Sequence, residues 1–192
     1  MTAPLRIARV VERSTVNGPG ERFVIWVQGC ALRCPGCWNP HTWPRRGGDL
    51  APADALVDRM RAAPGLEGVT FTGGEPMDQA AALAPIARAS RADGLSVFVF
   101  TGYELDELTD PAQKTLVALA DVVVTGRYDA VRRDLSLGWR GSTNQQVHFV
   151  TDRYSPADEP GASVCELHID ATGALTITGF PDDGLRAPFD RL

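Results

Sequence analysis

Four short apolar runs, separated by stretches with helical periodicity, constrain the fold of this chain more than any other feature of its sequence. Each run has the length and the β-branched or aromatic content of a buried strand. The runs are FVIWV (23–27), VTFT (69–72), VFVFT (97–101) and DVVVT (121–125). Strands that alternate with helices form a parallel sheet with right-handed crossovers. The sequence therefore predicts an α/β fold whose sheet is either open or curled into part of a barrel.

Three helices are expected between these strands, each with one apolar face. The stripes are formed by Leu56, Val57 and Met60 in the first, Ala80, Leu83 and Ala87 in the second, and Leu116 and Leu119 in the third. Pro85 should bend or shorten the second helix, because proline lacks the amide that an inner turn needs. The third helix should begin with Asp110 as its N-cap and Pro111 at its first helical position.

The pattern changes in the last part of the chain. A polar loop, TDRYSPADEPGAS (151–163), precedes CELHIDATGALTITGF (165–180), which is typical of a β-hairpin. We expect residues 1–151 to form the core, with a functional loop at 29–43. Residues 152–192 should form a C-terminal extension whose hairpin is appended to the main sheet.

Length and composition indicate one globular domain. The chain has 192 residues, 44% of them hydrophobic and 22% charged, which is enough for a sizeable core. Its net charge of -5 does not favour binding to nucleic acid or to an anionic membrane. The charged N-terminal segment predicts neither a secretory signal nor a transmembrane span. We therefore expect a cytoplasmic protein whose cysteines stay reduced and serve as metal ligands or catalysts.

Three of the four cysteines lie on one short loop directly after the first strand. In GCALRCPGCWNPHTW (29–43) they are Cys30, Cys34 and Cys37. Functional sites of parallel sheets lie at the carboxyl ends of the strands, so this loop is where a site is expected. A cubane iron–sulfur cluster usually takes four cysteine ligands, so three cysteines would leave one iron open to another ligand.

Two other interpretations of these cysteines stay open on spacing alone. Together with His41 they make a Cys₃His set that could close a structural zinc site. Free cysteines are also often buried as small, unreactive core residues. Cys165, alone in the C-terminal extension, is expected to be such a core residue, with the role of a distant fourth ligand as the alternative.

The second strand ends in a segment that suggests a ligand with an amino group. In VTFTGGEP, Gly73 and Gly74 allow the backbone to approach a ligand closely, and the carboxylate of Glu75 can bind an ammonium group. Glycine and proline also commonly do no more than end a strand. This segment is expected at the same edge of the sheet as the three cysteines, so a site shared by both is the stronger interpretation.

Six segments of the chain resemble, in the same order, those of one enzyme family. They are VNGPGER (16–22), GC…CPGCWNPHTW (29–43), TGGEP (72–76), TGYELDEL (101–108), GRYD (126–129) and WRGSTNQ with the following VHF (139–149). These segments and the intervals between the cysteines are similar to those of the radical S-adenosylmethionine enzymes. Within that family, the chain most resembles the small activating proteins of anaerobic ribonucleotide reductase. The resemblance covers most of the chain.

The resemblance implies a partial, open βα barrel with a [4Fe–4S] cluster at its mouth. Cys30, Cys34 and Cys37 would bind three irons, and the amino and carboxylate groups of S-adenosylmethionine would bind the fourth. Reductive cleavage of the sulfur–C5′ bond would then give a 5′-deoxyadenosyl radical that abstracts hydrogen. The expected activity is therefore that of a radical oxidoreductase.

Contacts with the cofactor also follow from the resemblance. The implied residues are Gly36 and Trp38 for adenine, Gly73, Gly74 and Glu75 for the methionine amino group, and Thr101, with Gly102 and Tyr103, for the nucleoside. Trp38 could equally be a core aromatic residue, and Gly102 could mark a turn after the third strand.

Candidates for substrate or catalytic roles follow the fourth strand. Arg127 and Asp129 lie at the expected edge of the sheet, with a surface ion pair as the alternative. Asn144 lies in a polar loop with Arg140, Ser142 and Gln145 that suits a backbone or carboxylate ligand. A tight hairpin turn would explain the same loop without any ligand.

Three hypotheses about the target follow. In the activating family the hydrogen comes from a glycine of a large partner enzyme, which becomes a glycyl radical, and a flavodoxin or ferredoxin supplies the electron. The C-terminal extension could instead cover the docking surface, and the chain would then act alone on a peptide or small molecule. The third hypothesis is a non-catalytic Cys₃His zinc-binding module.

Overall fold

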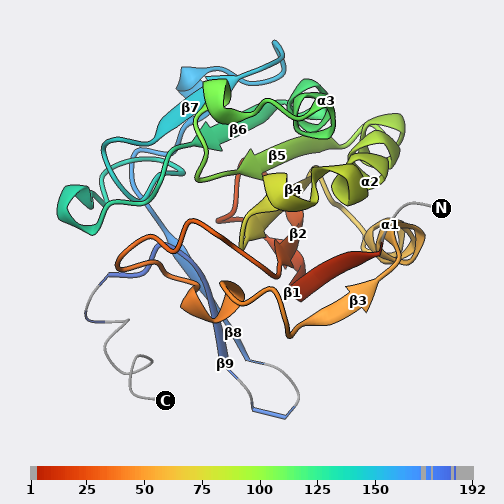
Figure 1. The fold of residues 1–192 in the computed structure, drawn as a ribbon, viewed down its shortest axis with the longest axis horizontal. Coiled ribbons are helices and arrows are strands. Elements are labelled where there is room, and N and C mark those ends of the chain that lie inside the picture. Colours follow the sequence, from red (N-terminus) through yellow and green to blue (C-terminus); the bar gives the residue numbers. More distant parts are fainter. Residues whose placement is uncertain (1–3, 170–171, 174, 183, 185–192) are drawn as a thin grey trace.

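The computed structural model describes residues 4–169, 172–173, 175–182 and 184 (Figure 1). A seven-stranded sheet forms its centre, with the strand order β3-β1-β2-β4-β5-β6-β7. The strands are β1 (Leu5–Ser14), β2 (Arg22–Val27), β3 (Asp49–Ala51), β4 (Gly68–Gly73), β5 (Ser96–Phe100), β6 (Val122–Thr125) and β7 (Gln146–Phe149). The α-helices are α1 (Ala53–Ala62), α2 (Ala80–Ala92) and α3 (Pro111–Leu119).

The four predicted strands form the centre of this sheet. β2, β4, β5 and β6 are parallel neighbours, so their carboxyl ends lie at one edge. β1 and β3 flank them on one side and β7 on the other, all in antiparallel pairing. The predicted α/β class is confirmed as a mixed sheet with a parallel centre. β1 was not predicted, because Arg6, Arg9 and Glu12 interrupt its apolar residues.

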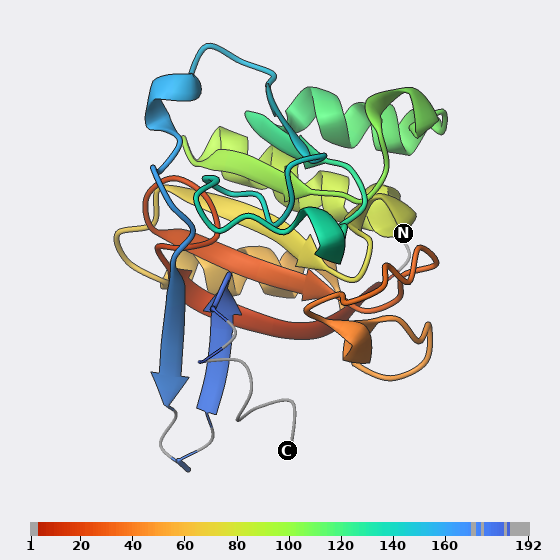
Figure 2. The ribbon, with the colours of Figure 1, turned by 90° about the vertical axis from the view of Figure 1, so that its left-hand side faces the viewer.

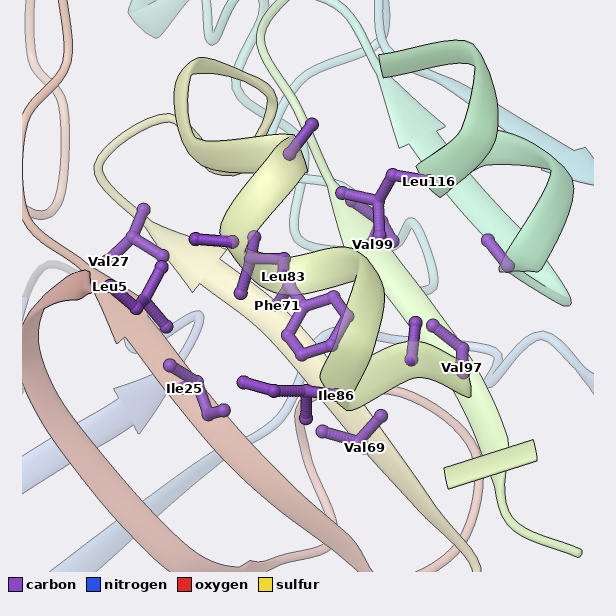
Figure 3. Packing of buried hydrophobic residues seen from close by; sticks show 14 of the residues in the cluster. Leu5, Ile25, Val27, Val69, Phe71, Leu83, Ile86, Val97, Val99 and Leu116 are labelled. Carbon is purple, nitrogen blue, oxygen red and sulfur yellow. The ribbon is translucent and has the colours of Figure 1, made fainter. Parts of the chain in front are cut away.

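One face of the sheet packs against the three α-helices. Phe23, Ile25 and Val27 of β2 point to this face and are fully buried, as the two-residue period of a strand requires. Figure 3 shows Leu83 and Ile86 of α2 packed over the strands in the same cluster. Burying one such side chain stabilises the fold by about 2 kcal/mol, so this face is the main hydrophobic core.

The helices form largely as predicted. Asp110 caps α3, since its Oδ1 accepts a hydrogen bond of 2.7 Å from the amide of Ala112, and Leu116 is fully buried. Pro85 does not shorten the second helix, because α2 continues for 13 residues to Ala92; the bend that was the other expectation stays a prediction. Packing of its apolar face on the sheet outweighs the lost hydrogen bond. In the described part of the chain, no helix has the length and apolar character to cross a membrane.

The second face of the sheet, opposite the helices, has a buried arginine at the amino-terminal ends of the parallel strands. Arg22 of β2 is fully buried, and burial lowers the pKa of its guanidinium to about 10. Nε donates to Thr70 Oγ1 at 2.6 Å, and Nη1 donates to Ser96 Oγ at 2.9 Å. The backbone carbonyls of Pro19, Val69 and Ser96 accept three more hydrogen bonds from it. Arg22 therefore joins β2, β4 and β5 on this face.

Replacing Arg22 by methionine should strongly destabilise the protein. The substitution keeps an apolar chain of similar length but leaves several buried acceptors without donors, each at a cost of about 1–3 kcal/mol. We expect the free energy of unfolding, measured by urea denaturation, to fall by about 4 kcal/mol or more. Arg46→Met, at an exposed position, is the matched control and should change it by less than about 0.5 kcal/mol. Equal stability of the two variants would contradict the role given to Arg22.

The C-terminal hairpin lies across the second face of the main sheet. Its strands are β8 (Cys165–Ile169) and β9 (Leu175–Gly179), which pair only with each other in a two-stranded sheet. Figure 2 shows this hairpin in front of the main sheet, with its strands running across the sheet strands and the helices behind. The predicted hairpin forms and packs on the core, but it does not add strands to the main sheet. The division into a core of residues 1–151 and an extension of 152–192 stays a prediction.

Candidate functional site

A pocket opens at the carboxyl ends of β2, β4 and β5. All three cysteines of the loop after β2 line it, as does the segment that ends β4. The lining residues are Arg9, Asn17, Trp26, Cys30, Leu32, Cys34, Cys37, Trp38, Asn39, Trp43, Thr72, Gly73, Gly74, Glu75, Phe100, Thr101, Gly102, Gly126, Tyr128, Gln145, Ile177, Thr178, Gly179, Phe180 and Pro181. The two segments that the sequence places at one edge of the sheet thus line the same pocket.

Backbone hydrogen bonds hold the cysteine loop in place at this edge. The amide of Gly29 donates to the carbonyl of Thr42 at 2.7 Å, and that of Cys30 donates to the carbonyl of Trp43 at 3.1 Å. The amide of Asn39 donates to Cys37 Sγ at 3.4 Å, a contact that stabilises a negatively charged sulfur. These bonds leave the three sulfurs on a closed loop that faces the pocket.

The three cysteines fit a [4Fe–4S] cluster. Each is a free thiol, partly exposed and part of the pocket lining. Burial raises the pKa of the Cys30 and Cys34 thiols, so a bound metal is what would keep these sulfurs ionised. Gly36 has a φ of +76°, and a Cβ there would lie 2.9 Å from Cβ of Ala130, so a larger residue would disturb the loop.

The alternative of a Cys₃His zinc site finds little support in the position of His41. Its side chain is exposed and does not line the pocket that the three cysteines share. Partial loss of water around the ring is the larger cause that lowers the pKa of His41, and the positive charge of Arg9 is the smaller one. Within the described ranges, no three side chains of His, Cys, Asp or Glu converge on one point as ligands of a single ion do. In a cubane each thiolate binds a different iron, so such convergence is not required.

The segment after β4 is bonded directly to the cysteine loop. The amide of Glu75 donates to the carbonyl of Gly29 at 2.8 Å, and that of Gly74 donates to the carbonyl of Val27 at 2.8 Å. A Cβ at Gly74 would overlap the carbonyl oxygen of Gly29, so only glycine allows this close approach. Gly73 has a φ of +101°, which glycine adopts without strain. The sequence predicted that these glycines let the backbone approach a ligand. In the structure they let two loops of the protein approach each other.

Glu75 is a buried carboxylate with three protein donors. Oε1 accepts from the amide of Met77 at 2.9 Å and from Thr101 Oγ1 at 2.7 Å, and Oε2 accepts from the amide of Gly102 at 2.8 Å. Its side chain is 1% exposed, and burial raises the pKa of this carboxyl group to about 7. Glu75 therefore connects the ends of β4 and β5 while it lines the pocket, and its remaining lone pairs can accept from a ligand.

The raised pKa of Glu75 predicts an unusual dependence of stability on pH. The ordinary value of 4.5 applies to the unfolded chain, and the value of about 7 applies to the fold. Between them the folded protein binds more protons, so this contribution is present below pH 4.5 and lost as the pH rises through 7. It amounts to about 3 kcal/mol. Urea unfolding of the metal-free protein at pH 5 and pH 7.5 should show this loss, and Glu75→Gln should remove most of it. If Glu75→Gln loses as much free energy of unfolding between pH 5 and pH 7.5 as the wild type does, the assignment to Glu75 is contradicted.

Other predicted cofactor residues lie at or beside the pocket. Trp38 and Gly36 are on the cysteine loop, and the guanidinium of Arg133 lies 5.0 Å from the centroid of the Trp38 ring. Thr101 and Gly102 both line the pocket and both bind Glu75. Tyr103 does not line it, because its hydroxyl donates outward to Asp78 at 3.0 Å. The contacts with S-adenosylmethionine assigned to these residues stay predictions.

The three candidate catalytic residues do not line the pocket. Arg127 makes a bidentate ion pair with Glu107, both bonds being 2.8 Å, at the surface. Asp129 accepts from the amide of Val131 at the start of a 3₁₀ turn, and Asn144 Nδ2 donates to the carbonyl of Arg127 at 2.8 Å. The structure thus has an ion pair and a turn at these positions. A catalytic role for Arg127, Asp129 or Asn144 stays a prediction.

The polar loop that precedes β7 is a compact turn. Gln145 Oε1 accepts from the amides of Gly141 and Ser142, and its Nε2 donates to the carbonyl of Gly126 at 3.1 Å. Arg140 forms an ion pair of 2.7 Å with Glu159 of the extension. Gln145 lines the pocket, whereas the other polar side chains of the turn are used within the protein.

Comparison with known proteins decides the family. A family model described as a 4Fe-4S single cluster domain matches residues 16–148. The anaerobic ribonucleoside-triphosphate reductase-activating protein of Escherichia coli strain K12 is 37% identical over 143 residues, which cover 70% of this chain and 92% of that protein. This chain belongs to that family. The predicted resemblance is confirmed, and with it a [4Fe–4S] cluster and S-adenosylmethionine as cofactors of this activating protein.

Further relatives agree with this membership. The activating protein of Salmonella typhimurium strain LT2 is 37% identical over 147 residues, covering 70% of this chain and 92% of that protein. The activating protein of phage T4 is 30% identical over 151 residues, covering 75% and 94%. The crystal structure of QueE from Escherichia coli shares 21% identity over 53% of each chain, with a TM-score of 0.39, which is too low to bear on the fold.

The sequence patterns missed a second wall of the pocket. Residues 177–181, which we call the strap, all line it, and they lie beyond the part of the chain that the family model matches. On the main sheet, Arg9 and Trp26 were also missed. Trp26 gave a signal, because it alternates with Phe23, Ile25 and Val27 and must face away from the helices. Cys165, by contrast, is half-buried on β8 and does not line the pocket.

Proposed function

We propose that this chain cleaves S-adenosylmethionine reductively at a [4Fe–4S] cluster and generates a glycyl radical on an anaerobic ribonucleoside-triphosphate reductase. One observation carries the proposal. Cys30, Cys34 and Cys37 share a pocket with the Gly73–Glu75 segment, and the 2.8 Å bond from the Glu75 amide to the Gly29 carbonyl joins the two loops. The relatives, named as activating proteins of such a reductase, support the choice of target.

The protein's own part in this chemistry is to bind, orient and exclude water. When bound, a reduced [4Fe–4S] cluster and S-adenosylmethionine would supply the one-electron cleavage of the sulfur–C5′ bond that gives methionine and a 5′-deoxyadenosyl radical. Cys30, Cys34 and Cys37 would hold three irons, and Glu75 on the adjoining loop would accept a hydrogen bond from the methionine ammonium. Trp26 and Phe100 supply apolar surface in the same pocket, which limits the access of water.

The route to the target follows from the open sheet. In this proposal the strands form the partial βα barrel of the radical S-adenosylmethionine type, and a glycine-bearing loop of the partner enters at the carboxyl edge. Hydrogen abstraction needs that glycine close to the cofactor. A flavodoxin- or ferredoxin-like protein would supply the electron.

The strap gives a reason to keep a second candidate. It lines the pocket from outside the matched family region, so an enzyme that acts alone on a peptide or small molecule is the alternative. In that case cleavage of S-adenosylmethionine would be the same, and only the hydrogen donor would differ.

An anaerobic incubation separates the two candidates. The reduced protein is mixed with S-adenosylmethionine and an anaerobic ribonucleoside-triphosphate reductase, and the sample is frozen for paramagnetic resonance. We expect a glycyl radical signal that disappears when the reductase glycine is replaced by alanine. Release of 5′-deoxyadenosine without any such signal would exclude this target and favour the second candidate.

A further inference from the structure

A bulge in β1 turns Arg9 toward the pocket. Leu5 and Ile7 of β1 point to the helix-covered face, and in a regular strand the side chain of Arg9 would follow them. Instead Ile7 lies opposite Val27 while Arg9 lies opposite Trp26, so β1 has one extra residue at this point. Bulges re-aim side chains in this way. Arg9 and Trp26 are therefore neighbours on the pocket side of the sheet.

The guanidinium of Arg9 is a sheltered cation without an anionic partner. It lies 4.2 Å from the centroid of the Trp26 ring, and Nη2 donates to the carbonyl of Ile177 at 3.2 Å. Nε is buried and has no hydrogen-bond acceptor among the described residues, and none of their carboxylates forms an ion pair with Arg9. By contrast, Arg13, Arg61 and Arg127 each pair with a carboxylate. The side chain of Arg9 is half-buried, and shielding a positive charge from water in this way is costly unless a negative group meets it.

The strap holds this cation in position. Its Ile177 carbonyl accepts from Arg9, and its Thr178 hydroxyl accepts a buried hydrogen bond of 2.7 Å from Asn17 Nδ2. At its far end the carbonyl of Pro181 accepts from Arg133 Nη2 at 2.8 Å. The strap thus crosses the pocket between β1 and the turn after β6, and one of its carbonyls fixes the direction of the Arg9 side chain.

We propose that Arg9 is a ligand-binding residue that pairs with the carboxylate of S-adenosylmethionine, and that the C-terminal extension orients it. The inference rests on the proposed function for the identity of the ligand. The chemistry that Arg9 recognises is a carboxylate in the same pocket as the three cysteines, which an arginine can bind with two parallel hydrogen bonds. The extension is then part of the cofactor site.

Binding measurements with and without the carboxylate test this pairing. The anaerobically reconstituted full-length protein is titrated by calorimetry with S-adenosylmethionine and with its decarboxylated analogue. For Arg9→Gln we expect the Kd of S-adenosylmethionine to rise about 10- to 100-fold, the loss of a hydrogen bond to a charged group. For the decarboxylated analogue, the Kd of Arg9→Gln should stay within about twofold of the wild-type Kd, because this compound has no carboxylate for Arg9 to bind.

Two further variants keep the result interpretable. Arg9→Lys retains the charge but not the planar fork, and should lie between wild type and Arg9→Gln for S-adenosylmethionine. Arg59→Gln on α1, an exposed arginine that pairs with Glu12, is the matched control and should bind both compounds as wild type does. Iron and sulfide content are measured for every variant, so that loss of the cluster is recognised.

The outcomes separate this inference from the proposed function. An unchanged Kd of S-adenosylmethionine in Arg9→Gln would overturn the pairing, even if the wild-type protein cleaves the cofactor. An equal weakening of both compounds would also overturn it, because it would show a general structural role. A wild-type protein that binds S-adenosylmethionine in an Arg9-dependent way but never cleaves it would leave the pairing intact and refute the proposed function.

Discussion

Cys34→Ala should lose its cluster and its cleavage of S-adenosylmethionine together. Cys34 is the middle one of the three proposed ligands, and it lines the shared pocket. Even a residue that only supports a metal ligand typically contributes about 10- to 100-fold to metal affinity or activity. Loss of a ligand itself should therefore lower the formation of 5′-deoxyadenosine more than about 100-fold, measured by chromatography after reduction with dithionite. Visible absorbance and iron content should fall in parallel.

Cys165→Ala is the matched control for this prediction. It removes the one other thiol of the chain, which lies on β8 outside the pocket lining. Iron content and cleavage should stay at the wild-type level. A Cys34→Ala protein that still cleaves S-adenosylmethionine at the normal rate would contradict the ligand assignment. A Cys165→Ala protein without its cluster would show that the fourth thiol takes part.

Gly74→Ala should separate the two loops that form the site. The added methyl group would overlap the carbonyl oxygen of Gly29 and lie 3.0 Å from that of Val27. Both are backbone atoms, so neither can move without shifting β2 or the cysteine loop. We expect a loss of about 2–4 kcal/mol in the free energy of unfolding. Cleavage of S-adenosylmethionine should fall about 100-fold, as a small displacement of reacting groups does.

Gly161→Ala is the matched control, because it replaces a glycine that no other part of the chain contacts closely. Gly161 has no atom within 4 Å of an added Cβ and no strained φ. Its replacement should leave urea unfolding and cleavage unchanged. If Gly74→Ala also keeps wild-type stability and cleavage, then the close contact between the two loops does not organise the site.

The sequence predicted the parts of this protein that depend on local patterns. Short, continuous apolar runs identified β2, β4, β5 and β6. Cysteine spacing identified the loop after β2 as a site, and the resemblance to a known family pointed to an iron–sulfur cluster there. The cap of α3 by Asp110 was also readable, since a short acidic side chain before proline has few other uses. What these cases share is that neighbouring residues alone determine the outcome.

The failures involve contacts between distant segments. The ion pair of Arg127 with Glu107, which lies twenty positions away, has no marker in the residues around Arg127. The strap was predicted as part of a hairpin, but the side-chain bonds from Arg9 and Asn17 that place it across the pocket were not predicted. The bulge that turns Arg9 has no marker in the sequence of β1. Such features follow from tertiary packing, which overrides local preference.

Product analysis after a single turnover is the most direct test of whether this protein cleaves S-adenosylmethionine reductively. Anaerobically purified wild-type protein is reduced with dithionite and supplied with S-adenosylmethionine, and methionine and 5′-deoxyadenosine are quantified against the iron content. We expect a brown, oxygen-sensitive protein that forms the two products in equal amounts. A colourless protein that contains zinc and forms neither product would contradict it.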